Sequence, residues 1–304
     1  MCQDYEGCNY WTFDASYIHT DDKRCWIKSS GTGPNTLINN QSGPKYGCVI
    51  PTKKRQNAAT NARTTTTITR RYLVATGCFD DSLCNTGNPG KTEIVDIFDP
   101  SKSCILEDIP DRFESIGGLL GATPVICGGR YASGSGNIYD ECLLYGTQQV
   151  ITMNNKNYQM ASVGLNSSLI WNLGGYLGGS YVLDTTEFIT INGAVNGPTL
   201  PEALFWSCAV KFPDNGWIYL TGGHTANGVT KNVWMSNPSD GFSSFTQGPS
   251  FIETRYQHGC GTMSVGAKSI IVAAGGCCSG NSDYKYNVEI LDPQSNTNQW
   301  VAGK

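Results

Sequence analysis

Few side chains in this chain of 304 residues are suited to catalysis or to metal binding. It has three histidines, His19, His224 and His258, and thirteen cysteines. The cysteines form no paired Cys-x-x-Cys blocks and no Cys/His combination with the spacing of a zinc site. The Gly-x-Ser-x-Gly elbow, the His-Glu-x-x-His motif and the Gly-x-x-x-x-Gly-Lys phosphate loop are absent as well. We therefore expect no catalytic residue, no metal site and no cofactor.

The cysteines are better explained by disulfide bonds, which form in an oxidising compartment. Cys127 and Cys142 lie in neighbouring predicted strands at similar distances from a flexible loop, so the two could face each other across a hairpin. Cys78 and Cys84 could close a loop of their own. The alternative is that some cysteines are buried thiols, and the odd total leaves at least one unpaired in a monomer.

Two N-glycosylation sequons agree with secretion. They begin at Asn40 and Asn166. No apolar run reaches the length of about 18 to 20 residues that a membrane span requires. We expect an extracellular or cell-surface protein without a membrane span in this chain.

A short apolar run closed by two glycines recurs along the chain and must position any binding residues. Four copies occupy 125–129, 170–175, 218–223 and 271–276, and a weaker fifth occupies 73–78. Such a run is typical of a strand buried on both faces, and glycine lets another backbone approach closely. Because one sheet cannot cover its own faces, copies about 50 residues apart indicate a radial or stacked array of sheets.

Each copy is expected to have four antiparallel strands. The first strand precedes the glycine pair, as at 158–164, 205–212 and 257–265. The third follows it, at 93–99, 140–145, 182–189, 232–236 and 287–292. Asp-Pro pairs at 99–100 and 292–293 would end two of these strands. The fourth strand is short and contains Ile105, Met153, Ile191, Phe245 or Trp300.

Over about residues 60–304 the chain resembles the kelch family of β-propellers. The resemblance depends on the glycine pairs, on a Tyr or aliphatic position in the third strand, on Phe245 and Trp300, and on the segments 109–112, 200–201 and 254–258 that lead into the first strands. It implies an all-β, kelch-type β-propeller at 63–304 with five visible four-stranded blades. Either the ring closes with five blades, or the chain as given holds an incomplete ring.

The first 48 residues resemble a partial PAN/apple domain, a small disulfide-rich extracellular module. Cys2, Cys8, Cys25 and Cys48 frame an aromatic segment and a Cys-Trp-Ile-Lys sequence. The resemblance implies a Cys2–Cys8 pair and partners for Cys25 and Cys48 upstream of this chain, so Met1 would not begin the mature module. Residues 49–62, with the basic run at 53–55, are expected to form a linker.

Composition and topology together predict a binding surface. A net charge of -4 with 15% charged residues argues against phosphate neutralisation, so nucleic acid is not expected as a partner. In four-stranded blades, the loops between second and third strands emerge on the same face as the links between blades. Arginines and aromatics there are typical of binding hot spots for a protein or glycan ligand. The predicted ligand-binding residues are Arg112, Arg130, Tyr131, Trp206, His224 and Arg255.

Two other functions compete with binding. The kelch fold also occurs in copper radical oxidases resembling galactose oxidase, which need two histidines, two tyrosines and a cysteine cross-linked to one tyrosine. Here His258 stands where an ordinary kelch repeat enters its first strand, and His224 has no second histidine or carboxylate at a ligand spacing. We therefore expect no enzyme. A structural component of an extracellular matrix is the other alternative, and the oligomeric state is left open.

Overall fold

The protein is all-β and its chain divides into two compact units. The computed structural model describes the backbone of 72–75, 92–96 and 104–106 and, further along, residues 112, 114–121, 123–130, 137–144, 147, 149–277 and 284–303. One unit comprises Ile18–Asp111, and the other includes Arg112–Lys304. The predicted domains at 1–48 and 49–62 lie outside the described residues. The boundary at Asp111 falls inside the region predicted as a propeller.

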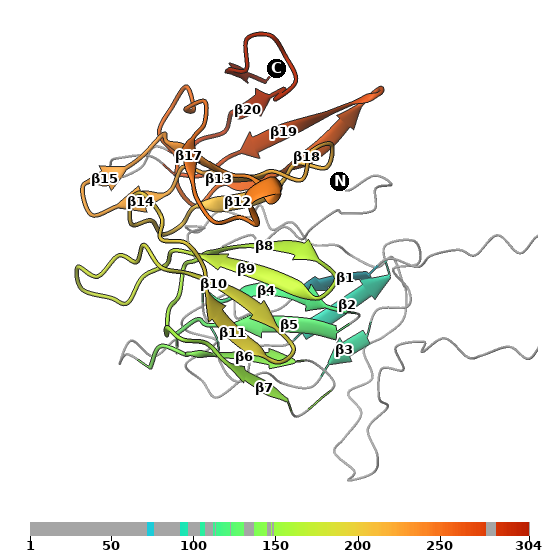
Figure 1. The fold of residues 1–304 in the computed structure, drawn as a ribbon, viewed down its shortest axis with the longest axis vertical. Helices are drawn as coiled ribbons and strands as arrows, with labels where there is room; N and C mark the ends of the chain where they lie inside the picture. Colours follow the sequence, from blue (N-terminus) through green and yellow to red (C-terminus); the bar gives the residue numbers. More distant parts are fainter. Residues whose placement is uncertain are drawn as a thin grey trace, which may run out of the picture. The chain divides into compact units, whose positions relative to one another are not determined.

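Six antiparallel sheets are described: a two-stranded hairpin and five larger sheets whose strands are hydrogen-bonded in chain order (Figure 1). The first unit contains a sheet of β1 (Tyr72–Ala75), β2 (Thr92–Asp96) and β3 (Cys104–Leu106). The second unit contains four sheets of four strands, which we call sheets 1 to 4.

The strands of sheets 1 to 4 are short. Sheet 1 has β4 (Ile116–Leu120), β5 (Thr123–Cys127), β6 (Glu141–Leu144) and β7 (Val150–Thr152). Sheet 2 has β8 (Ala161–Asn166), β9 (Leu169–Leu173), β10 (Thr186–Thr190) and β11 (Gly193–Asn196). Sheet 3 has β12 (Cys208–Lys211), β13 (Ile218–Thr221), β16 (Val233–Ser236) and β17 (Thr246–Gln247). Sheet 4 has β18 (Gly259–Val265), β19 (Lys268–Ala274), β20 (Val288–Leu291) and β21 (Trp300–Ala302).

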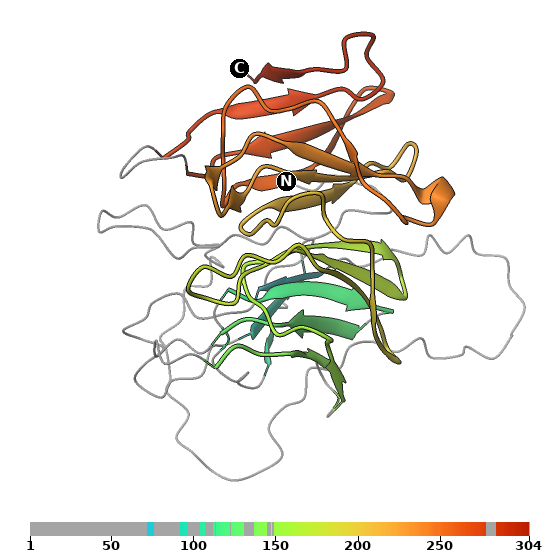
Figure 2. The ribbon, with the colours of Figure 1, turned by 60° about the vertical axis from the view of Figure 1, so that its left-hand side comes forward.

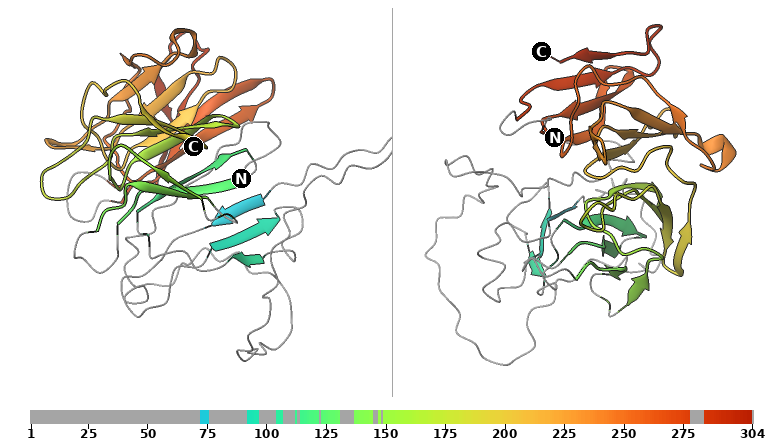
Figure 3. Two further views of the ribbon diagram at one scale, coloured as in Figure 1. Left: turned by 60° about the horizontal axis from the view of Figure 1, so that its bottom comes forward. Right: turned by 90° about the vertical axis from the view of Figure 1, so that its left-hand side faces the viewer.

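Sheets 1 to 4 follow one another from green to red in Figure 2, and Figure 3 shows them from two other directions. Among the described residues, three hydrophobic cores pack these sheets together. The core between sheets 1 and 2 includes Val125, Cys127 and Ile170. The core between sheets 2 and 3 includes Trp171, Leu173, Ile218 and Leu220. The core between sheets 3 and 4 includes Tyr219, Phe251, Ile271, Ala273 and Trp300. Neighbouring residues of β9 and β13 thus enter different cores, which is why these runs are apolar without alternation.

The predicted second and third strands agree with the structure more closely than the first and fourth. β20 ends at Leu291, just before the Asp292-Pro293 pair that was expected to stop it. The first strands β8 and β12 begin three residues later than predicted, because Gln159 and Trp206 have positive φ angles of 58° and 54° that extended backbone cannot continue through.

The fourth strands were placed imprecisely. Trp300 lies in the fourth strand β21 as predicted, and Ile105 lies in β3, the last strand of a sheet with three described strands. Met153 follows β7, Ile191 precedes β11 and Phe245 precedes β17. One hairpin was not predicted, β14 (His224–Thr225) with β15 (Gly228–Val229). A single turn of 3-10 helix, Pro238–Asp240, follows β16. No helix within the described residues is long and apolar enough to cross a membrane.

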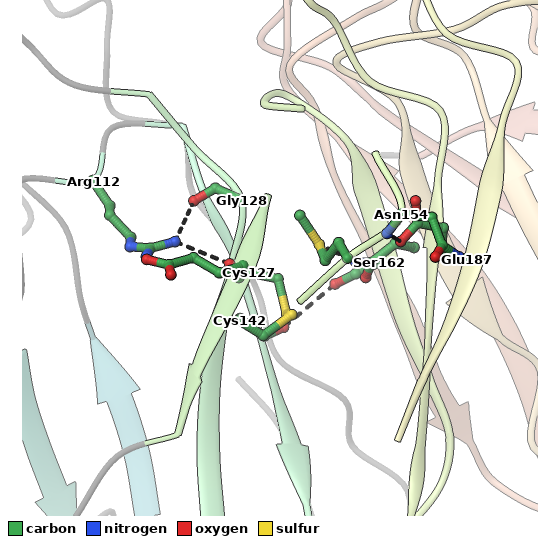
Figure 4. Close-up of a disulfide and its surroundings, with 11 residues drawn as sticks. Arg112, Cys127, Gly128, Cys142, Asn154, Ser162 and Glu187 are labelled. Atoms are coloured by element: carbon green, nitrogen blue, oxygen red, sulfur yellow. Dashed lines mark hydrogen bonds and ion pairs between the residues drawn. A yellow bond between two sulfur atoms is a disulfide. The ribbon is translucent and has the colours of Figure 1, made fainter. Parts of the chain in front are cut away.

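Among the described residues, the second unit contains two disulfides. Cys127 of β5 and Cys142 of β6 are directly opposite in the ladder and are bonded, which is the pairing that the sequence predicted (Figure 4). The second bond, Cys208–Cys260, was not predicted and joins the first strands of sheets 3 and 4. The predicted disulfide cysteines Cys2, Cys8, Cys25, Cys48, Cys78 and Cys84 lie outside the described residues.

The glycine pairs let consecutive sheets meet backbone to backbone. In sheets 1 to 3 the second glycine of the pair donates its N–H to a carbonyl in the segment leading into the next sheet, Gly129 to Asn157, Gly175 to Leu204 and Gly223 to Arg255, over 2.7 to 2.9 Å. The first glycine of the pair is also restricted, both by its φ angle and by nearby backbone. Gly174 has φ +65°, and a Cβ there would lie 2.2 Å from the Leu204 carbonyl oxygen.

Replacing Gly174 with alanine is expected to destabilise the protein severely. Positive φ alone costs about 1 kcal/mol for a non-glycine residue, and the contact with the Leu204 backbone should raise the loss to about 3 kcal/mol or more. Gly266 is a matched control because it has φ +63° and nothing within 4 Å of a Cβ. Urea unfolding of Gly174→Ala and Gly266→Ala measures both losses. Equal losses would contradict the close approach of the two sheets.

Removing the disulfide between sheets 3 and 4 is expected to cost more than removing the one inside sheet 1. Cys208 and Cys260 are 52 residues apart, whereas Cys127 and Cys142 are 15 apart. The loop-closure model gives about 4 kcal/mol for the longer loop and about 3 kcal/mol for the shorter. Thermal unfolding of the two double alanine variants tests the order. A larger loss for the shorter loop would contradict it.

Candidate binding surface

A left-handed turn precedes the first strand of each of sheets 1 to 4. Its central residue has positive φ in each case, at Glu114, Gln159, Trp206 and Gln257, with values between 53° and 58°. The N–H of each of the last three donates to the carbonyl of the one before, over 2.8 to 3.0 Å. Non-glycine residues in this region store strain of about 1 kcal/mol or more, which tertiary contacts must offset. The four turns therefore line up at one end of the four sheets, which we call the glycine-pair end.

Aromatic side chains gather around these turns. Tyr158, Tyr176, Phe205, Trp206, His224 and Tyr256 form a continuous chain of ring contacts with centroids 4.7 to 5.7 Å apart, which we call the aromatic cluster. Its members come from the ends of sheets 2, 3 and 4. Tyr158 and Phe205 are buried, and the other four are half-buried. The cluster thus shows part of several rings to solvent.

A charged group lies beside the aromatic cluster. The carboxylate of Glu114 accepts hydrogen bonds from Arg130 Nε and Gln159 Nε2, each over 2.6 Å. The Glu114 side chain is 3% exposed and that of Arg130 is 34% exposed. Arg130 also lies 5.2 Å from the ring centroid of Tyr158. Burial raises the pKa of Tyr158, and the positive charge of Arg130 opposes that shift. Arg130 is therefore a cation of this surface that is partly open to solvent and is held by Glu114.

Three of the predicted ligand-binding residues meet at this end. Arg130, Trp206 and His224 all belong to the surface just described, although they come from sheets 1 and 3 and from the β14–β15 hairpin. His224 Nδ1 lies 2.7 Å from the Thr225 carbonyl oxygen. Tyr131 lies outside the described residues.

Arg255, in contrast, is an interior residue. It is 0% exposed, and its Nη2 lies 2.7 Å from Glu289 Oε1 and 3.2 Å from Asn287 Oδ1. Its Nη1 donates to the Gly275 carbonyl over 2.9 Å. Glu289 also accepts from the backbone N–H of Ile252 over 2.7 Å. Arg255 therefore ties the entry of sheet 4 to its glycine pair, and we correct its predicted role to a structural one.

Arg112 is buried in the same way at sheet 1. It is 3% exposed, donates from Nη1 to the carbonyls of Gly128 and Glu141 over 3.0 Å each, and pairs with the Glu141 carboxylate (Figure 4). At the equivalent place in sheet 2, Asn157 Nδ2 donates to the Gly174 carbonyl over 3.2 Å. The predicted ligand contact of Arg112 is corrected for the same reason.

One of the two predicted glycosylation sites lies among the described residues. Asn166 is exposed at the end of β8, where its Oδ1 accepts from the Ser168 N–H, so the predicted glycosylation site lies on the surface. Asn40 lies outside the described residues.

Tyr158, Tyr176 and Glu114 were not predicted as site residues. The sequence feature that could have located this site is the aromatic residue directly before the left-handed turn, at Tyr158, Phe205 and Tyr256. Two tyrosines of the loops at this end are strongly exposed, Tyr181 at 71% and Tyr286 at 91%.

The described residues contain no group of three or more His, Cys, Asp or Glu side chains placed to hold a metal ion. His258 lies inside the protein, where its Nε2 is 2.9 Å from Thr221 Oγ1. Burial, together with the charge of Arg255, lowers the pKa of His258 to about 3. The imidazole is therefore neutral at physiological pH.

No protein-family model matches this chain, and no curated protein matches it. The likenesses to kelch repeats and to the PAN/apple domain therefore rest on the residues quoted from the sequence.

His258 is expected to make the protein less stable in acid. The unfolded state binds a proton near pH 6.5 and the folded state only near pH 3, so the free energy of unfolding should fall as pH drops between these values, by up to about 1.4 kcal/mol per pH unit. His258→Gln should flatten this slope. Urea unfolding at intervals from pH 7.5 to 4 measures the slopes. An identical slope in His258→Gln and wild type would contradict the assignment.

Proposed function

We propose that this protein is an extracellular recognition protein that binds a protein or carbohydrate ligand at the glycine-pair end of a kelch-like β-propeller. The supporting observation is the aromatic cluster, which draws rings from three consecutive sheets to one end and keeps four of them half-buried beside Arg130. Partly exposed aromatic rings and an oriented arginine provide contact area at a small cost in conformational entropy.

Loop composition supports the same end. The loops at 174–185 and 222–232, which begin with the glycine pairs of sheets 2 and 3, are rich in Gly and together contain Tyr, Ser, Thr and Asn. Tyrosine supplies rigid amphipathic area, and the small polar residues supply adaptable hydrogen bonds, as in antibody loops. Tyr181 lies in the first of these loops and is mostly exposed, so its ring is available to anchor a ligand.

Secretion is supported by the two disulfides, since such bonds persist in oxidising compartments. Under this proposal the PAN/apple-like residues 2–48 add a second binding module, and residues 63–304 form the blades of the propeller. Four meandering antiparallel sheets that pack face to face in succession are compatible with such blades.

Ligand binding should depend on the glycine-pair end. Candidate ligands come from a glycan array and from an extracellular protein library screened with the disulfide-bonded protein. For each hit, Tyr181→Ala and Arg130→Ala should weaken binding about tenfold or more, because hot-spot residues contribute about 2 kcal/mol or more. Val195→Ala is the control, since Val195 is 65% exposed on the outer strand β11. Surface plasmon resonance measures the dissociation constants.

The control and the variants must share the wild-type circular dichroism spectrum and melting temperature. Binding that is lost in Val195→Ala but kept in both other variants would overturn the proposed surface. Turnover of sugars or aldehydes by copper-loaded protein would favour an oxidase. Self-assembly of the purified protein with no ligand in either screen would favour a structural role.

A further inference from the structure

An open cleft lies between the loop that joins β20 to β21 and the segment that links sheet 3 to sheet 4. Its volume is about 490 Å³. The residues that line it are Pro249, Ser250, Thr297, Asn298, Gln299 and Trp300. The cleft has no residue in common with the aromatic cluster, so we treat it as a separate site.

Hydrogen bonds hold the two walls of the cleft in place. Trp300 Nε1 donates to the Pro249 carbonyl over 2.8 Å and so joins one wall to the other. The indole also packs on the ring of Phe251, with centroids 4.5 Å apart. Within the loop, the Asn298 N–H donates to Ser295 Oγ over 3.1 Å and to the Ser295 carbonyl over 3.2 Å. The cleft is thus preformed, and a ligand would lose little affinity to ordering it.

The link into sheet 3 has the same local structure as the link into sheet 4. The two sequences are Gly197-Pro198-Thr199-Leu200 and Gly248-Pro249-Ser250-Phe251. In both links the glycine N–H donates to the carbonyl of the first residue of a third strand, Thr186 or Val233, over 2.8 and 2.7 Å. The fourth residue of each link is buried in the core between its two sheets. The two links can therefore be compared residue by residue.

Aromatic rings fill the space beside the first link. Phe245 and Phe242, from the segment between β16 and β17, contact the Trp171 ring with centroids 5.3 and 5.5 Å apart. In sheet 4 the residue that corresponds to Phe245 is Trp300, and the residue three positions before it is Thr297. A small polar side chain thus stands where sheet 3 has the ring of Phe242. The cleft beside the second link is open for that reason.

The side chains around the cleft are neutral and can form hydrogen bonds. Asn298 and Gln299 carry amides that both donate and accept, and Ser250 and Thr297 carry hydroxyls that do the same. Among the described residues, no charged side chain lines the cleft, so it offers no ionic partner to a carboxylate, a phosphate or an ammonium group. Trp300 is 5% exposed and offers little apolar area to a peptide side chain. The hydroxyl groups of a sugar donate and accept as well, and they match this lining.

We propose that this cleft binds a neutral mono- or disaccharide. Its volume lies within the range of about 300 to 1,000 Å³ that is usual for small-molecule sites. The cleft is open and has no exposed aromatic ring on which a sugar could stack, so binding should be weak, with a dissociation constant on the order of 1 mM. The proposal does not depend on ligand binding at the glycine-pair end.

Saturation-transfer NMR tests the proposal with glucose, galactose, mannose, N-acetylglucosamine, maltose and lactose, each up to 50 mM. Wild type should bind at least one of them. Gln299→Ala and Ser250→Ala should each raise the dissociation constant about fivefold, since each removes a hydrogen-bonding group. Thr297→Phe, which supplies the ring that Phe242 provides in sheet 3, should abolish binding. Gln247→Ala is the control, because Gln247 is exposed on β17 and does not line the cleft.

Absence of binding to every one of these sugars at 50 mM, or binding that all three cleft variants leave unchanged, would overturn the proposal. Tighter binding of glucuronic acid than of glucose would contradict a neutral ligand. Binding that is lost in Arg130→Ala but kept in the cleft variants would place the sugar at the glycine-pair end and would refute the cleft as its site. Unchanged circular dichroism spectra and melting temperatures of the variants ensure that lost binding is not a lost fold.

Discussion

The structure depends on burial of both faces of each sheet against its neighbours. A four-stranded sheet whose second strand is apolar on both sides exposes too much hydrocarbon to be stable alone, and burial of apolar area at about 25 cal/mol per Å² is the main term that offsets the entropy of ordering the chain. Trp171 and Ile170 are adjacent in β9 and yet enter different cores. A substitution in one sheet can therefore alter the packing of two interfaces.

Close packing of the sheets requires that their backbones meet at the glycine-pair end. The glycine N–H groups reach the next entry segment, and the left-handed turns bond to one another from Glu114 to Gln257. The turns hold non-glycine backbone in a conformation that is unfavourable in isolation. The same rigid framework presents the aromatic cluster, so the part of the protein with the most constrained backbone is also the part proposed to bind a ligand. Preformed surfaces of this kind lose little entropy on binding.

Much of this fold could be predicted from residues that act locally. The apolar runs and glycine pairs located the second strands, and the opposition of Cys127 and Cys142 followed from hairpin symmetry. Contacts between sheets could not be predicted in this way. The Cys208–Cys260 bond and the burial of Arg255 both depend on which strands become neighbours in space. The strand starts at β8 and β12 were misplaced because Gln159 and Trp206 adopt a backbone conformation that their residue types do not reveal.

The segments that lead into the four sheets show why residue type alone is a poor guide to function here. Two residues before each left-handed turn stand Arg112, Asn157, Leu204 and Arg255. The first, second and fourth all donate to the carbonyl of the first glycine in their own sheet, and Leu204 instead packs into the core between sheets 2 and 3. A guanidinium and an amide satisfy the same buried acceptor, and a leucine fills the same space without doing so. Buried polar groups are almost always paired. An arginine at this position therefore indicates a hydrogen-bond acceptor inside the protein and not a ligand. Arg130 differs because its backbone lies beyond the glycine pair, where one side of the guanidinium reaches solvent.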